Sequence, residues 1–127
     1  MNKATVISVV VAGLLVLGGL MLAGDSEGAW QSDNVSTSSG TQVVEITAKG
    51  GYMPRQTTAH AKVATVLKVK TQGTFDCAAA LTIPSIGYRA MLKPTGEVAI
   101  EIPPQKEGSV LQGVCAMGMY NFQIRFN

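Results

Sequence analysis

Apolar and polar residues alternate along most of the chain between residues 42 and 127. In Val43–Ala48, apolar side chains occupy every second position, which is the period of a strand with one buried face. The same alternation recurs in Ala64–Thr71 and Glu97–Ile102. Further strands are expected over residues 56–61, 81–83, 86–92, 109–114 and 120–126.

Glycine and proline separate these segments at close spacing, and no amphipathic helix of useful length interrupts them. A short helix over Ala78–Ala80 is possible, although it is too short to be stable by itself. Many short strands with frequent turns predict an all-β domain, a Greek-key β-sandwich or barrel, over residues 42–127.

The hydropathy pattern changes sharply at the N-terminus. Lys3 precedes an uncharged apolar run, Ala4–Gly24, which is long enough for one transmembrane helix. Asp25 and Glu27 follow the run, so the positive-inside rule places the C-terminal domain outside the cytoplasm. Residues 1–24 are therefore expected to be a membrane anchor, with a cleaved signal sequence as the alternative. Both imply export, and the anchor implies a single-pass protein of the cell membrane with a periplasmic or extracellular domain.

Residues 25–41 are rich in Ser, Thr, Gly, Asn and Asp. Trp30 and Val35 are the main apolar residues there, too few to offset the entropy of ordering the segment. A flexible linker between the anchor and the domain is expected.

The formal net charge is +2, and the basic residues are scattered along the chain. Neither a basic run nor interleaved aromatic residues indicate a nucleic-acid surface. Motifs of the serine hydrolases, zinc proteases and phosphate-binding loops are absent from the sequence. The protein is therefore not expected to be an enzyme.

Sulfur is concentrated near the C-terminus. Cys115, Met117 and Met119 fall within five residues, between two predicted strands. The other cysteine, Cys77, lies far upstream. Thiolate and thioether donors in one loop favour a soft metal ion, above all Cu(I).

Three segments resemble those of the cupredoxins, the copper-binding Greek-key sandwiches. These are Lys49–Pro54 after the first strand, Asp76–Cys77 in a mid-chain loop, and Cys115–Tyr120 between the last two strands. The chain looks most like a subgroup with a mid-chain cysteine and a C-terminal Cys-x-Met-x-Met-Tyr motif, found in exported or membrane-tethered bacterial proteins of copper handling. Blue-copper sites use two histidines, one cysteine and an axial methionine. Here the single histidine, His60, is distant from both motifs in sequence and is expected to be a surface or hydrogen-bonded residue.

We hypothesise that Cys77 and Cys115 bind copper as thiolates, with Met119 as a third donor and Met117 as a fourth donor or a neighbour. An extended segment would turn both methionines toward Cys77, whereas a tight loop at Gly118 would turn one away. A structural disulfide and free buried thiols are the alternatives for an exported cysteine pair. A redox-switched pair, a disulfide without metal and a dithiolate with it, lies between them.

The sequence thus predicts an exported, membrane-tethered copper-binding protein for Cu(I) carriage, delivery or copper resistance. A copper donor or acceptor protein, or a redox partner, would be its counterpart. Two alternatives remain: a copper electron-transfer protein, and a metal-free β-sandwich stapled by a Cys77–Cys115 disulfide. Tyr52 and Tyr120 flank the motifs and are expected to orient the loops by packing.

Overall fold

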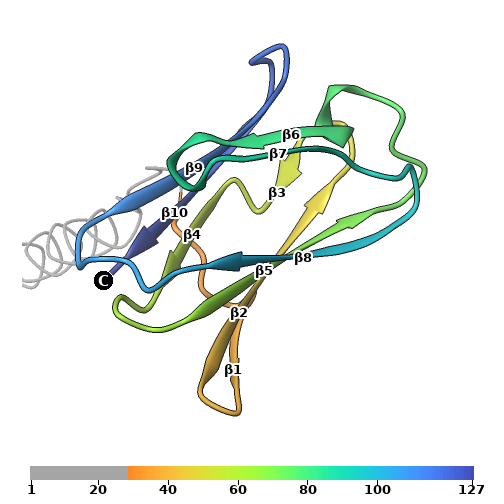
Figure 1. Ribbon diagram of the computed structural model, residues 1–127. Helices are drawn as coiled ribbons and strands as arrows, with labels where there is room; N and C mark the ends of the chain where they lie inside the picture. The colour runs from red at the N-terminus through yellow and green to blue at the C-terminus, as the bar shows by residue number, and fades with distance from the viewer. Residues whose placement is uncertain (1–28) are drawn as a thin grey trace, which may run out of the picture.

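Two β-sheets face each other in the computed structural model, which describes residues 29–127 (Figure 1). The first sheet has the order β1-β2-β5-β8, and β3 pairs with β2. Its strands are β1 (Val35–Ser38), β2 (Thr41–Ala48), β3 (Tyr52–Met53), β5 (Thr65–Thr71) and β8 (Gly96–Ile102). The second sheet has the order β4-β10-β9-β6-β7. Its strands are β4 (Gln56–Ala59), β6 (Ala80–Ile83), β7 (Tyr88–Met91), β9 (Val110–Cys115) and β10 (Asn121–Phe126).

Most neighbouring strands in the two sheets are antiparallel. The exceptions are β2 with β5 and β4 with β10, which run parallel. Two 3₁₀ helices complete the described fold, η1 (Cys77–Ala79) before β6 and η2 (Pro84–Ile86) before β7. The expectation of an all-β sandwich is confirmed, and the short helix foreseen near Ala78 is η1.

The core lies between the sheets, and the predicted alternation accounts for it. Every second residue of β2 is buried, and β5 likewise buries Leu67 and Val69. The opposite sheet contributes Leu111 from β9 and Phe122 from β10. Gly113 lies beneath Phe122, and a Cβ atom at this position would overlap the phenylalanine ring. Glycine is therefore required on this strand because an aromatic ring occupies the side-chain position.

Part of the predicted flexible linker, residues 25–41, forms regular structure. The structure describes residues 29–41 of this segment. Residues Val35–Ser38 form β1, which pairs with β2, and Ser39 and Gly40 connect the two strands with positive φ angles of 51° and 78°. Two such residues suit the tight turn of a hairpin. Earlier in the same segment, the Trp30 ring lies under the Arg125 guanidinium, which is 4.2 Å from the ring centre. Backbone pairing and one aromatic contact order this polar segment, although its composition suggested flexibility.

The predicted transmembrane helix or signal sequence, residues 1–24, lies outside the described residues. Between residues 29 and 127, no helix is long and apolar enough to cross a membrane.

Candidate metal centre

The first cysteine is held at the start of η1. Asp76 caps this helix, and its carboxylate accepts two backbone hydrogen bonds, from Ala78 N at 2.8 Å and from Gly50 N at 2.8 Å. An aspartate at this position satisfies amides that would otherwise lack partners at the helix start. Asp76 therefore fixes the backbone on both sides of Cys77 and joins it to the β2–β3 loop.

The second cysteine ends β9, just before the loop that leads into β10. Cys115 N donates to Tyr120 O at 3.0 Å, and Gly118 N donates to Cys115 O at 2.8 Å. Tyr120 N also donates to the Cys115 sulfur at 3.4 Å. Gly118 has a φ of 72°, so the loop is a tight turn and not an extended segment. The turn projects beyond the sheet that carries it (Figure 1).

The two cysteines meet at this end of the sandwich. Cys77 and Cys115 are joined by a disulfide across 38 residues of sequence, with their Cα atoms 5.6 Å apart. β6 makes this meeting possible because it follows η1 directly and pairs with β9, so that Leu81 lies opposite Cys115. Cys115 is buried, whereas Cys77 is partly exposed. The two cysteines meet as predicted. They form a disulfide, which was one of the alternatives that the sequence allowed.

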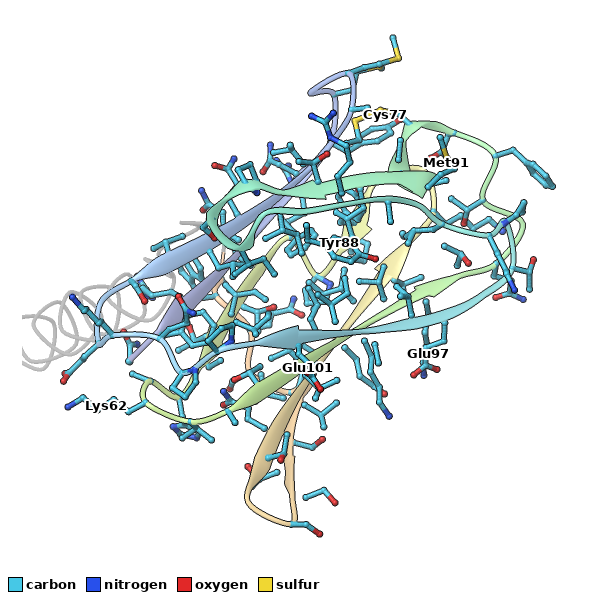
Figure 2. All side chains as sticks on the ribbon, viewed as in Figure 1. Lys62, Cys77, Tyr88, Met91, Glu97 and Glu101 are labelled. Atoms are coloured by element: carbon cyan, nitrogen blue, oxygen red, sulfur yellow. A yellow bond between two sulfur atoms is a disulfide. The ribbon has the colours of Figure 1, made fainter. Side chains whose placement is uncertain are left out.

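Both candidate thioethers lie at the same end but on different sides of the turn. Met117 is 77% exposed and lines a shallow apolar hollow together with Cys77 and Met91. Met119 is 64% exposed and lines a neighbouring hollow with Met53. The two methionines thus line different hollows, and both side chains are largely exposed. Figure 2 shows Cys77 and Met91 side by side at this end, far from Lys62.

Tyr52 and Tyr120 connect the two cysteine-bearing arms. The buried Tyr52 hydroxyl donates to Ala78 O at 3.0 Å, one residue after Cys77. Burial, and secondly the charge of Asp76, raise the pKa of Tyr52 to about 12, so the phenol remains a neutral donor. The Tyr120 ring lies against Gly51. A Cβ atom added to Gly51 would be 3.6 Å from the nearest ring carbon of Tyr120. The segment from Gly50 to Tyr52 therefore touches both arms, which agrees with the orienting role expected of the tyrosines.

His60 lies at the other end of the sandwich. It follows β4 directly, where the neighbouring Ala59 is paired with Phe126 at the end of β10. The loop that carries Cys115 precedes the start of β10 instead. The backbone of His60 is held by the buried side chain of Gln42, which accepts from His60 N at 2.8 Å. His60 is exposed, which agrees with the expectation of a surface histidine away from the sulfur cluster.

Sequence reasoning missed several residues around the cysteines. The capping role of Asp76 was not predicted. It could have been, because aspartate just before a short helix is a recognisable capping signal. Phe75 and Met91 are 84% and 78% exposed beside Cys77. Met53 is also exposed, next to Met119. Phe75 is near Cys77 in sequence, whereas no sequence pattern indicates Met91 or Met53, because the folding of separate strands brings them to this end.

The donor set fits Cu(I) once the cysteine pair is reduced. It would then offer two thiolates with exposed thioethers beside them, which is a soft, sulfur-only set. Within residues 29–127, no group of three or more His, Cys, Asp or Glu residues could hold a metal ion. A set of two thiolates and thioethers suits a soft metal ion and differs from the oxygen ligands that magnesium and calcium prefer.

Comparison with known proteins gives one family match. The model of the family described as "cupredoxin-like domain" matches residues 14–124. No curated protein matches the sequence.

The solved structures of similar fold include two copper proteins. One is the metal-binding domain of the Cu(I)-exporting P-type ATPase CopA of Streptococcus pneumoniae D39 with Cu(I), at a TM-score of 0.69 and 19% identity over 79% of this chain and 99% of that one. The other is a copper-binding protein in the apo form, at a TM-score of 0.67 and 20% identity over 76% of this chain and 98% of that one.

Proposed function

The chain belongs to the cupredoxin-like domain family, and from this premise we propose that it binds Cu(I) as cargo at the sulfur-rich end of the sandwich, for carriage, delivery or resistance. The observation that carries the proposal is the meeting of Cys77 and Cys115 beside Met117 and Met119. Two structurally similar proteins, a metal-binding domain with Cu(I) and a copper-binding protein, add support. As in the sequence analysis, the ligands are the two thiolates, with Met119 third and Met117 fourth or adjacent.

The geometry gives each residue a distinct part. Cys115 is buried and held by the turn, so it provides a fixed thiolate. Cys77 is partly exposed and provides the thiolate that meets the ion first. Exposed thioethers are weak, mobile donors, which suits an ion that must be passed on to another soft site. Binding depends on deprotonated thiols, so the reduced pair is the competent state.

Cu(I) carriage is favoured over electron transfer by the position of His60. Blue-copper sites need two imidazole ligands, and the single histidine of this sequence lies at the opposite end of β10 from the sulfur loop. Electron transfer at this site would have to use a different donor set.

A second candidate function has a specific observation in its favour. The Cys77–Cys115 disulfide suits a metal-free module in which the bond stabilises an exported domain. A closed loop of 38 residues would stabilise the fold by about 3 to 4 kcal/mol on the chain-entropy account. In that case the exposed methionines would serve no metal.

We also propose that the domain works outside the cytoplasm, tethered to the cell membrane, near a copper donor or acceptor protein. The apolar run Ala4–Gly24, preceded by Lys3 and followed by Asp25, supports this placement. Fractionation of cells that produce the full chain tests it, because washing with high salt and with carbonate should leave the protein in the membrane pellet. Release of the whole chain by either wash would contradict the tether.

The decisive experiment is a titration of the reduced domain with Cu(I), without oxygen and against a competing Cu(I) chelator. We expect one tightly held ion, and C115A should abolish tight binding. M119L tests the third donor, with M91L as a matched control because Met91 is similarly exposed at the same end. Unchanged affinity in C115A would overturn the assignment, and an M91L effect equal to that of M119L would overturn the choice of Met119.

A further inference from the structure

The fold accommodates the oxidised state of the cysteine pair. In the structure, where the disulfide is formed, the turn after Cys115 is closed by backbone hydrogen bonds, and Asp76 caps η1. The 5.6 Å between the Cα atoms lies within the range of ordinary disulfides. The oxidised pair is therefore compatible with the strands that carry it. A pair that can lose two electrons within an intact fold is a potential reductant.

Hard donors that could stabilise Cu(II) are poorly placed for this pair. Cu(II) prefers nitrogen and oxygen ligands in a tetragonal arrangement. His60 is at the other end of the sandwich, and both carboxylate oxygens of Asp76 are occupied by backbone amides. Between residues 29 and 127, no cluster of three His, Cys, Asp or Glu residues offers an alternative. A Cu(II) ion that reached the reduced pair would meet mainly sulfur, which favours the transfer of an electron to the metal.

Access to the pair runs through the partly exposed sulfur. Cys77 lines the apolar hollow with Phe75, Met91 and Met117, whereas Cys115 is 1% exposed. An incoming ion therefore meets Cys77 first. Once the disulfide has formed, thioethers are the soft donors that remain at this end, and they suit Cu(I) better than Cu(II). The donors around the cysteine pair thus suit Cu(I), the product of reduction, better than Cu(II), the ion that would be reduced.

We propose that the reduced domain is a stoichiometric reductant of Cu(II). The Cys77 and Cys115 thiols each give one electron to a separate Cu(II) ion, a bond forms between the two sulfur atoms, and two protons pass to water. Two Cu(I) ions result for each disulfide. The thiolates are consumed, so the product copper leaves for another soft acceptor or stays with the thioethers. An external dithiol, which becomes a disulfide, must then reduce the pair before it can react again.

This reaction separates two ways of loading the protein. Copper supplied as Cu(I) finds both thiolates and is held, as in the proposed function. Copper supplied as Cu(II) is reduced, and the chain that reduced it loses its thiolate site. The redox state of the incoming copper therefore determines whether a given chain stores the ion or converts it.

The test is an anaerobic titration of the fully reduced domain with Cu(II), in the presence of a chromophoric Cu(I) chelator. We expect two Cu(I) ions and the loss of two thiols per chain, with a monomeric product lighter by two hydrogen atoms. C115S, which leaves the partly exposed Cys77 as the single thiol, should yield at most one Cu(I) ion per chain, and its disulfide should join two chains. A long-lived thiolate-to-Cu(II) absorption band, or Cu(I) formation while both thiols persist, would overturn the proposal.

A second arm shows whether the folded arrangement matters. In concentrated urea, the two thiols are separated by 38 residues of flexible chain, and their effective concentration falls. We expect the urea-unfolded chain to form the intramolecular disulfide at least about tenfold more slowly than the folded one. Equal rates would refute a role for the fold.

The two proposals fail separately. A domain that binds Cu(I) tightly but leaves Cu(II) unreduced refutes only the reductant. A domain that reduces Cu(II) but holds no Cu(I) supplied directly refutes only the carriage function.

Discussion

Replacing Asp76 with alanine removes both hydrogen bonds that fix the backbone around Cys77. Loss of a helix cap costs about 1 kcal/mol, and loss of the more exposed contact with Gly50 costs about 1 kcal/mol as well. We expect D76A to lower the free energy of unfolding by roughly 2 kcal/mol. In the reduced domain it should also weaken Cu(I) binding about 10- to 100-fold, because residues that orient ligands commonly have effects of this size.

Two measurements check this prediction, urea unfolding of the oxidised domain and chelator competition for Cu(I) by the reduced one. D76N keeps the side-chain shape and one acceptor oxygen, so it should fall between D76A and the natural protein. E107A is the matched control, because Glu107 is an exposed acid far from the cysteines. It lies in a turn beside Gly108, and Gly108 N donates to Phe126 O at the other end of β10. If D76A behaved like E107A in both measurements, the positioning role of Asp76 would be wrong.

The remaining predictions concern the core beside the site. For Tyr52, the folded-state pKa of about 12 lies above the ordinary value of 10.0, so the stability gained from the neutral phenol is complete below pH 10 and declines toward pH 12. The natural protein should therefore lose on the order of 2 kcal/mol more than Y52F over this window in urea unfolding, and parallel curves would contradict the pKa shift. G113A should destabilise the domain by about 1 to 3 kcal/mol or more, since the added methyl group would overlap the Phe122 ring. A melting temperature equal to that of the natural protein would exclude this close packing.

How far the fold could be predicted depends on the source of each element's stability. In β2 and β5, side chains alternate between core and solvent, so the period of two was visible in the sequence and the strands were placed correctly. In β1, three of the four residues are exposed, and the strand is held by pairing with β2. The Ser39–Gly40 turn was the sequence feature that could have indicated β1. The composition of residues 25–41 suggested a flexible linker instead. Patterns of apolar residues predict elements that bury side chains and miss those held mainly by backbone hydrogen bonds.

The candidate centre shows the same division. Crowding of Cys115, Met117 and Met119 in one loop indicated soft-metal chemistry without any structure, because donor type is a property of the residues themselves. The approach of Cys77 was only a hypothesis until β6 was found beside β9, because pairing between distant strands depends on the whole fold.

Local sequence therefore set the strand pattern, the turn positions and the kinds of donor atoms. Pairing of distant strands within the second sheet set the partner of each cysteine, and tertiary contacts set the separate hollows lined by Met117 and Met119 and the bond from Gly50 N to Asp76. The physical reason is range. Alternation and turn chemistry act over a few neighbouring residues, whereas the geometry of this site depends on strands that are tens of residues apart in sequence and become neighbours only in the folded sheets.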